Sequence, residues 1–358
     1  MSDSAQSNSG WRKKLKWVIA GLVAGAAGVA VLVLWFAGVS VGNSDPLFHG
    51  RPESEWIKNL KYWDDAQVKE WKGYGEEGVQ VLIRGLERAN RPGERAYRKL
   101  YRRVPFALTR RLPDPKDDST RSSRMCMVSL LESLGTDAKS ATPIMERMLK
   151  NDEADSVRQC VINFFNSSED EKCLLNQLPA KEKQALLPAL IRDVQNKNNW
   201  GLRNNAAISL KYFPEERGIV APILTNAVHD PQPQVAIVAA GALNRVAPDL
   251  ITNAGVVAIM AQILKNPDDQ IAYRAAEVLG EMKAEPAIAV PALIEAMNGT
   301  NRLVATDATQ ALLKFEQPAE LIRPALEAAM QRKDLSGWIK KRVKEKIDLM
   351  AAAEKAAH

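Results

Sequence analysis

A short apolar pattern returns at a near-constant interval through the second half of this 358-residue chain. In each copy a proline, or once an alanine, is followed by two apolar residues, a polar turn and a second amphipathic run. The marked residues lie roughly 33 to 36 positions apart, and they are Pro188, Pro222, Ala258, Pro291 and Pro324. A repeat of this length is the signature of a solenoid, in which each copy is one small supersecondary unit.

The second run of each unit carries a stripe with the spacing i, i+4, i+5 and i+8, which is one face of an α-helix. The four stripes are Leu202, Ala206, Ala207, Leu210; Val235, Ala239, Ala240, Leu243; Ile271, Ala275, Ala276, Leu279; and Val304, Ala308, Thr309, Leu312. Small residues at the centre of each stripe favour close approach of two helices. Neither helix of such a hairpin can bury its stripe alone, so neighbouring hairpins must stack. We therefore predict an all-α fold, an α-solenoid of helical hairpins.

With these features the chain resembles the HEAT-repeat family. The resemblance rests on the early proline of the first helix, the paired small residues of the second, and the polar turns at 229–231 and 266–269. It implies fold rather than function, because HEAT arrays serve many unrelated partners. Arg158 and Arg203 match the position where the family carries an arginine that pairs with a loop carboxylate of a neighbouring repeat. The resemblance thus implies a structural ladder at these two residues.

The N-terminal part contains a candidate membrane anchor. No charge occurs in residues 17–41, and roughly 25 apolar residues exceed the length needed to span a bilayer. Four basic residues precede the segment and mixed charges follow it, so the positive-inside rule places the N-terminus in the cytoplasm. The repeats would then lie on the extracytoplasmic side, which is the periplasm in a bacterium. A cleaved signal peptide is the alternative, because small residues at 37–42 suit a signal peptidase.

Composition and pattern divide the chain into six parts. They are a disordered, basic N-terminal stub (1–16), a transmembrane helix (17–41), a linker (42–52), an N-terminal helical cap region (53–103), the repeat array (104–350) and a tail that should fray (351–358). The segment around Trp56 resembles the entry segment found ahead of HEAT arrays in exported bacterial proteins. Ser54 can cap a short helix there, with Trp56, Ile57 and Leu60 as its apolar face. Such a helix would close the open end of the stack.

The sequence contains no recognisable catalytic set. Residues 73–78 spell G-x-G-x-x-G, but no strand precedes them and two glutamates within them would repel a pyrophosphate. The three histidines, His49, His229 and His358, are far apart in the sequence. No zinc-binding or phosphate-binding motif accompanies them. We therefore expect a protein without enzymatic activity, and we expect no cofactor and no metal.

Three cysteines are present, Cys126, Cys160 and Cys173. Their number is odd and no Cys-x-x-Cys occurs, which argues against a disulfide framework or a zinc site. Cys126 and Cys160 hold matching places in successive second helices, each two residues after an arginine. We expect small buried core residues, with Cys160–Cys173 as the pairing that stays open.

The most unusual local feature after the apolar segment is a basic stretch from Arg84 to Arg124. The net charge of the whole chain is +6, and tyrosines are interleaved in this stretch. Its candidate anion-binding residues are Arg95, Arg98, Arg102, Arg103, Arg110 and Arg111. They would form a surface for anionic lipid or an envelope polyanion. The alternative is a solvated face whose arginine stems cover apolar surface.

A solenoid offers a concave surface lined by its second helices, which can bind a protein or peptide. Candidate partner contacts on that surface are Arg158, Arg203 and Arg274. We therefore predict a non-enzymatic, membrane-anchored interaction scaffold with its array outside the cytoplasm. The alternative is a nucleic-acid- or polyanion-binding module, of the HEAT-like DNA glycosylase or lyase type, that uses residues 84–124. Export would remove nucleic acid as a partner.

Overall fold

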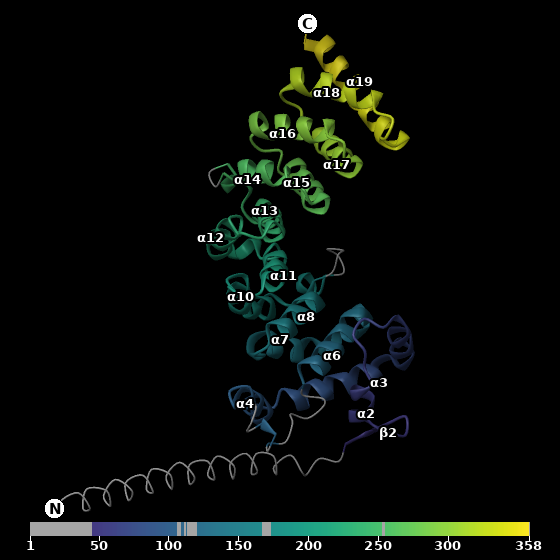
Figure 1. Ribbon diagram of the computed structural model, residues 1–358, viewed down its shortest axis with the longest axis vertical. Coiled ribbons are helices and arrows are strands. Elements are labelled where there is room, and N and C mark those ends of the chain that lie inside the picture. The colour runs from purple at the N-terminus through teal and green to yellow at the C-terminus, as the bar shows by residue number, and fades with distance from the viewer. Residues whose placement is uncertain are drawn as a thin grey trace, which may run out of the picture. The chain divides into compact units, whose positions relative to one another are not determined.

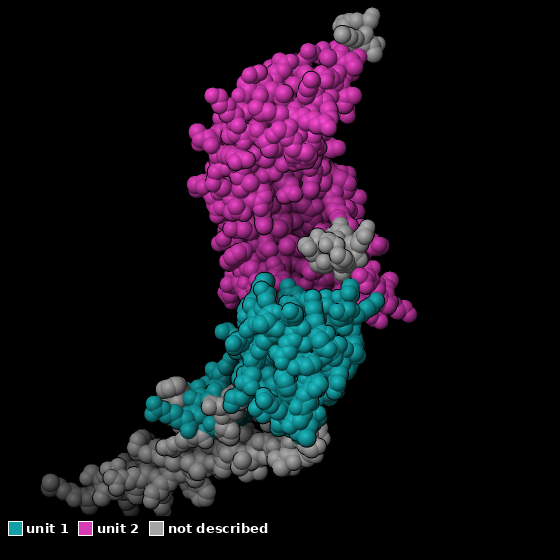
Figure 2. Space-filling model, turned by 90° about the vertical axis from the view of Figure 1, so that its right-hand side faces the viewer, with its two compact units in different colours: residues 1–154 teal, residues 155–358 magenta. Residues whose placement is uncertain are grey.

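The computed structural model describes residues 45–105, 109–110, 112, 120–166, 173–252 and 255–357. The predicted stub and transmembrane helix lie outside these residues, and so does Arg111. In the described part of the chain, no helix combines the length and the apolar character that crossing a membrane requires. Nearly all of the regular structure is helical (Figure 1). The chain forms two compact units, residues 1–154 and 155–358, which Figure 2 colours separately.

Unit 1 begins with a small antiparallel hairpin and continues as helices. Its elements are β1 (Leu47–Phe48), β2 (Arg51–Pro52), α2 (Glu53–Lys58), α3 (Asp65–Ala89), α4 (Pro92–Tyr101), α6 (Arg121–Leu134), the 3-10 segment η2 (Gly135–Ala141) and α7 (Thr142–Asn151). Helix α3 is the centre of the unit, because it contacts α2, α4, α6, η2 and α7. The cap region expected at 53–103 therefore packs directly on α6, which lies within the predicted repeat array (104–350).

Helix α2 begins one residue earlier than its expected cap. We predicted Ser54 at the N-cap, but the helix starts at Glu53 and Pro52 holds the capping position without a side-chain hydrogen bond. Asp45 takes over the role from outside the helix, since its carboxylate accepts the backbone N–H of Ser54 at 3.3 Å. The correction has a simple cause: proline lacks an N–H, which makes it a good residue at the start of a helix.

The glycine-rich segment lies inside α3 and interrupts it. Gly75 has φ 56° and ψ −141°, a conformation that is not helical and that favours glycine. The helix is therefore broken at Gly75, and it resumes after this residue and ends at Ala89. No strand precedes the segment directly among the described residues, so it is a helix break and not a dinucleotide loop.

Unit 2 is a stack of helical hairpins (Figure 1). It opens with α8 (Asp155–Phe165) and the short α9 (Leu174–Gln177). The hairpins that follow are α10 (Ala180–Val194) with α11 (Trp200–Leu210), α12 (Arg217–Ala227) with α13 (Pro233–Val246), α14 (Val256–Ile263) with α15 (Asp269–Met282), α16 (Pro286–Asn298) with α17 (Arg302–Leu312), and α18 (Ala319–Gln331) with α19 (Gly337–Ala357). Two 3-10 turns, η4 (Pro214–Glu216) and η5 (Pro248–Leu250), join successive hairpins.

The predicted stripes form the core of unit 2. Leu202, Ala206, Ala207 and Leu210 are each 0 % exposed. Along the stack, the second helices contact one another more extensively than the first helices do. The second-helix layer is therefore the shorter, inner side of a curved stack, as a solenoid requires.

Two expectations need correction. The repeated prolines lie further inside the first helices than the early position that the resemblance implied, and their side chains are exposed on the outer layer. Solvent can satisfy the carbonyl that each proline leaves without an N–H partner, which makes the interior position tolerable. The tail expected to fray continues as helix to Ala357, because alanine has the highest helix propensity. The expectation of buried core cysteines is confirmed, since Cys160 and Cys173 are buried and form no disulfide with each other.

Candidate functional site

Carboxylates of unit 1 pair with several arginines of the basic stretch and so neutralise part of its charge. Glu53, at the first position of α2, is 0 % exposed and accepts bonds from two arginines of α3. Arg84 donates Nε and Nη2 to Oε1 at 2.8 and 2.5 Å, and Arg88 donates Nη1 to Oε2 at 2.8 Å. Arg84 and Arg88 therefore connect α2 to α3, and both guanidinium groups pair with a carboxylate of the protein itself.

Two further arginines of the stretch lie in the interior. Arg98 is 5 % exposed, and its guanidinium binds the carbonyl of Ala89 and the carboxylate of Glu153, the latter at 2.9 Å. Arg124 is 1 % exposed and binds Asp152 at 2.9 Å and Glu153 at 3.3 Å. Burial opposes ionisation of Glu153, but the hydrogen bond from Arg98 and the charge of Arg124 outweigh it and hold its pKa below the ordinary value.

Arg98, proposed above as an anion-binding residue, is therefore a structural residue in this fold. The remaining candidates are more open: Arg102, Arg103 and Arg110 are exposed and Arg95 is half-buried. Arg102 also approaches Glu153, at 3.9 Å. Within the described residues, the basic stretch is thus a set of internal ion pairs with a smaller exposed cationic surface beside it.

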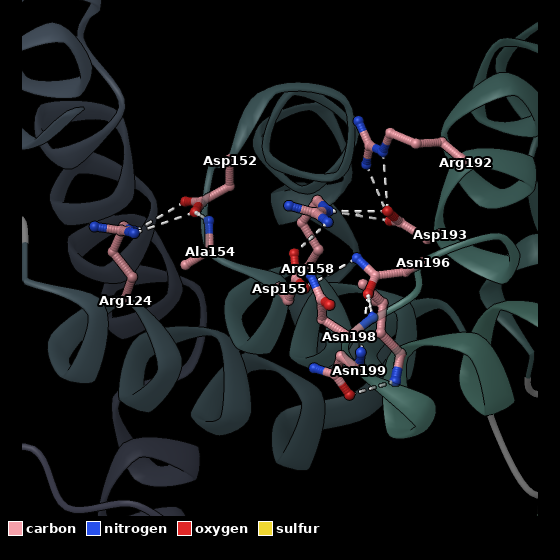
Figure 3. Close-up of polar contacts among 11 residues, drawn as sticks. Arg124, Asp152, Ala154, Asp155, Arg158, Arg192, Asp193, Asn196, Asn198 and Asn199 are labelled. Atoms are coloured by element: carbon pink, nitrogen blue, oxygen red, sulfur yellow. Dashed lines mark hydrogen bonds and ion pairs between the residues drawn. The ribbon is translucent and has the colours of Figure 1, made fainter. Parts of the chain in front are cut away.

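The arginines of unit 2 form the ladder that the family resemblance implied. Figure 3 shows one of its two arginines, Arg158, with Asp155 and Asp193. On α8, Arg158 donates Nε to both carboxylate oxygens of Asp193 at 3.1 Å and Nη2 to Asp155 at 2.7 Å. On α11, Arg203 binds Asp230 through Nε at 2.7 Å and through Nη2 at 2.9 Å. Only Asp230 lies in a loop, because Asp193 belongs to the last turn of α10.

The sequence analysis missed the buried member of this series in unit 1. Arg124 pairs with Asp152 just after α7, as Arg158 and Arg203 pair with carboxylates beyond their own helices. The signal was present, because Arg124 precedes Cys126 as Arg158 precedes Cys160. Later second helices carry alanine at this position, at 236, 272 and 305, so the arginine ladder ends after α11.

None of the ladder arginines is an open contact on the inner face. Arg158 is 6 % exposed and its guanidinium faces two carboxylates. Arg203 shares its charge with Asp230 beside a hollow of about 400 Å³. Of the three arginines suggested for partner contact, Arg274 is the exposed one, with Nε 3.4 Å from the hydroxyl of Tyr273.

The inner face instead presents amide side chains near the start of unit 2. Asn205 of α11 donates to the side chain of Asn163 on α8 at 2.5 Å, and Asn204 donates to Asn205 at 3.1 Å. Asn166 accepts from the hydroxyl of Ser209 at 3.1 Å. The amides of Asn163, Asn204 and Asn205 are only half-buried, so part of their hydrogen-bonding capacity faces solvent.

Aromatic and acidic residues complete this face. Trp200, at the first position of α11, is 47 % exposed and stands one helical turn before Asn204. Further along the stack the chain places the acidic residues Glu277 on α15 and Asp307 on α17. Burial, and then the negative charge of Glu277, raise the pKa of Asp307 above its ordinary value. The second helices thus carry neutral amides near the start of unit 2 and charged side chains of both signs, Arg274 with Glu277 and Asp307, further along the stack.

The described residues bring no catalytic set together. His49 lies in the hairpin turn of unit 1 and contacts Tyr74, whereas His229 is exposed in a turn of unit 2. Among these same residues, no group of three His, Cys, Asp or Glu side chains could hold a metal ion. The arrangement offers surfaces for binding and no assembled nucleophile, base and oxyanion donor.

Comparison with known proteins gives structural likeness only. No protein-family model matches the chain, and no curated protein matches it either. A designed armadillo repeat protein is 15% identical, with 58% of this chain and 99% of that chain covered and a TM-score of 0.46. An engineered protein is 16% identical over 84% of this chain and 87% of its own, with a TM-score of 0.48. A designed armadillo repeat protein in complex with the peptide (KR)4 is 16% identical over 59% and 98%, with a TM-score of 0.42.

The arrangement of the helices in unit 2 defines the fold class of the protein. Unit 2 repeats one hairpin with one buried stripe, its second helices form the inner layer, and its successive arginines pair with successive carboxylates. These features make the protein an all-α helical-repeat solenoid.

Proposed function

We propose that this protein is a non-enzymatic scaffold that binds a protein or peptide on the inner face of unit 2. The observation that supports the proposal is the exposed row of neutral hydrogen-bonding and aromatic side chains on α8 and α11. Trp200, Asn204 and Asn205 leave apolar area and amide groups open to solvent on rigid helices. Exposed tryptophan is enriched among the residues that dominate binding energy at protein interfaces.

The neighbouring contacts explain why this face suits a peptide backbone better than a charged small molecule. Arg158 and Arg203, the strongest local charges, are already paired with carboxylates. Amides both donate and accept, so they can satisfy the alternating N–H and C=O groups of an extended chain. Groups held on packed helices lose little conformational entropy when they bind.

A site-specific crosslinking experiment tests this proposal. A photoreactive amino acid is placed at Asn204, Val238 or Arg274 on the second helices, and at Ile219 or Ile288 on the first helices as matched controls. The two controls are 52 % and 41 % exposed, whereas Asn204 and Val238 are half-buried, so poor accessibility cannot explain a missing adduct at the controls. We expect one discrete adduct from the inner positions and none from the outer ones.

The substitution Trp200→Ala should abolish the adduct formed from Asn204. Trp338→Ala, at another exposed tryptophan of unit 2, is the control for loss of an aromatic side chain. Adducts of equal yield from both layers, or an adduct that survives Trp200→Ala unchanged, would contradict binding at the inner face.

We also propose that residues 17–41 anchor the scaffold in a membrane, with the repeats on the extracytoplasmic side. The support is the uncharged length of this segment and the basic residues before it. Alkaline phosphatase fused after Met350 should be active in intact bacteria while the full-length protein stays in the membrane fraction. A shortened, soluble band would indicate a cleaved signal peptide, and activity of a cytoplasm-only reporter would overturn the orientation.

Fewer residues support the polyanion-binding alternative in the structure than in the sequence. Arg84, Arg88, Arg98 and Arg124 have carboxylate partners inside unit 1. What remains open is the exposed surface around Arg103, so this alternative requires binding that depends on that surface and weakens with salt.

A further inference from the structure

Unit 1 contains an aromatic pocket that the proposed scaffold function does not use. Its volume is about 170 Å³, and it lies between α2, the loop after it and the first turns of α3. The lining residues are Arg51, Glu55, Trp56, Asn59, Leu60, Gln67, Glu70 and Trp71. Typical pockets for drug-sized ligands measure roughly 300 to 1,000 Å³, so this one suits a single side-chain-sized group.

Two indole rings form perpendicular walls of the pocket. The rings of Trp56 and Trp71 are 6.3 Å apart between centroids, with an interplanar angle of 89°. Trp71 is 1 % exposed, and Trp56 is fixed by the hydrogen bond from Nε1 to the carbonyl of Phe48 at 2.8 Å. Phe48 and Tyr74 pack edge-on against Trp56. The walls are therefore held in place before any ligand arrives.

The floor of the pocket is pinned from the loop side. Gln67 donates its side-chain amide to the carbonyl of Asn59 at 3.0 Å and accepts the backbone N–H of Lys61 at 2.8 Å. This pair of bonds holds the loop after α2 against the start of α3 within the described structure. A pocket whose opposite sides are both fixed binds with little loss of conformational entropy.

The charges around the pocket favour a cation. Glu55 and Glu70 are exposed carboxylates in the lining, and Arg51 is the basic residue among the lining side chains. The guanidinium carbon of Arg51 already lies 5.9 Å from the centroid of the Trp56 ring, within the range of a cation–π interaction. Two carboxylates and one guanidinium leave a net negative charge at a site where an indole face attracts positive charge.

We propose that this pocket binds an alkylammonium group, either as a free quaternary ammonium compound or as the side chain of a lysine in a partner. The partly exposed Trp56 ring provides the cation–π attraction, which is strongest for indole among the aromatic side chains, and the buried Trp71 ring supports it from behind. Glu55 and Glu70 supply the charge complement, and the small volume excludes nucleotides. Arg51 acts as an internal cation that a ligand displaces.

Titration of the full-length protein tests the proposal. The protein is kept in a nonionic detergent, which carries no ammonium group, because residues 17–41 are long and apolar. Choline and Nα-acetyl-lysine N-methylamide are the two probes, and 3,3-dimethylbutanol is the neutral shape analogue of choline. Binding is followed through the indole N–H signals in ¹H–¹⁵N spectra, with the Trp56 signal assigned by the Trp56→Phe variant.

We expect a saturable shift of the Trp56 signal with a cationic probe and no shift with the neutral analogue. Tighter binding of choline would identify a quaternary ammonium ligand, and tighter binding of the lysine derivative would identify a peptide side chain. Equal response to the neutral analogue, or no response to either cation, would overturn the proposal.

Three variants check that the pocket itself is responsible. The double substitution Glu55→Gln with Glu70→Gln should raise Kd about two- to fivefold, the size expected for exposed charge pairs. The amide introduced by Glu70→Gln would retain an oxygen that accepts the hydroxyl of Tyr74, as the carboxylate does at 2.7 Å. Arg51→Gln should lower Kd, because it removes the internal competitor. Glu77→Gln, an exposed change elsewhere on α3, should leave Kd unchanged.

Discussion

Arg124 and Asp152 form an ion pair that is closed to solvent on both sides. Nε lies 2.9 Å from Oδ2, and the side chains are 1 % and 0 % exposed. Asp152 also accepts the backbone N–H of Ala154 at 2.9 Å. One carboxylate therefore fixes both a guanidinium of α6 and the turn that ends unit 1.

Removing either partner should destabilise unit 1 strongly. Asp152→Ala leaves a buried guanidinium without its main counter-charge, which costs about 3 to 5 kcal/mol of unfolding free energy in comparable buried pairs. Arg124→Met leaves the carboxylate buried and should cost a similar amount. Urea denaturation followed by tryptophan fluorescence measures both, since Trp71 is buried in unit 1.

The double variant Arg124→Met with Asp152→Ala should be less destabilised than the sum of the single changes, because neither charge is then left alone. Lys265→Ala, which breaks an exposed ion pair with Glu295, is the control and should change the denaturation midpoint little. Strict additivity of the two substitutions at Arg124 and Asp152 would show that their contact contributes nothing.

Glu132 should make the stability of unit 1 depend on pH. Burial raises the pKa of this α6 carboxyl from 4.5 to about 7. Between these values the unfolded chain ionises Glu132 while the folded chain keeps it protonated, so the folded state binds more protons. The free energy of unfolding should therefore fall as pH rises from 4.5 to about 7, by at most about 3 kcal/mol.

Glu132→Gln removes this titration and should flatten the pH profile over that range. The variant should also be more stable than the parent protein once the pH exceeds the folded-state pKa, where the parent carries a buried charge. Glu77→Gln is the matched control, because Glu77 is exposed on α3. An unchanged slope in Glu132→Gln would assign the pH dependence to other groups.

Two glycines of the second helices should respond in opposite directions to substitution by alanine. A methyl group at Gly280 of α15 would come within 2.8 Å of Cα of Ala311 in α17. Because backbone atoms cannot move aside cheaply, Gly280→Ala should destabilise unit 2 by about 1 to 3 kcal/mol. A methyl group at Gly241 would meet only Val278, at 3.9 Å.

Gly241→Ala should therefore stabilise the protein by up to about 1 kcal/mol through helix propensity. Thermal denaturation of the two variants side by side checks both signs. Destabilisation of the same size at both positions would mean that helix packing in the stack tolerates no added volume anywhere, contrary to the space around Gly241.

The repeat could be predicted from the sequence because its information is local. The i, i+4, i+5, i+8 spacing alone placed Leu202, Ala206, Ala207 and Leu210 on one face, and all four are buried. The family pattern likewise located Arg158 and Arg203, which have carboxylate partners. Periodicity within one helix suffices to predict the buried stripe, since it does not depend on how distant segments meet. The two arginine pairs join distant segments, and only the family resemblance indicated them.

Other contacts between distant segments could not be predicted. Glu53 meets Arg84 and Arg88 across 31 and 35 residues, and no local pattern marks a carboxylate as buried. The arginines of the basic stretch were interpreted as one surface because the sequence shows how many lie close together but not which of them are buried. In the fold, Arg98 points inward and Arg103 is exposed.

Buried and exposed arginines of the basic stretch should differ in how much their substitution lowers the free energy of unfolding. Arg98→Ala removes the partner of Glu153 and of the Ala89 carbonyl, and it should lower the unfolding free energy by about 3 kcal/mol or more. Arg103→Ala removes an exposed charge and should change it by less than about 0.5 kcal/mol. Thermal denaturation of the two variants, which carry the same chemical change at nearby positions of the sequence, measures the difference.

Charge reversal then shows whether the exposed part of the stretch binds anions. Lys99→Glu with Arg103→Glu should fold like the parent, because neither side chain is buried. If the surface binds a polyanion, this double variant should sediment less with anionic vesicles as the fragment 45–358, and the parent's binding should weaken as salt increases. Lys341→Glu with Lys344→Glu, two exposed reversals in unit 2 that lower the net charge by the same amount, is the control for altered net charge. Equal sedimentation of parent and double variant would leave the basic stretch with the structural role that Arg84, Arg88 and Arg98 have in unit 1.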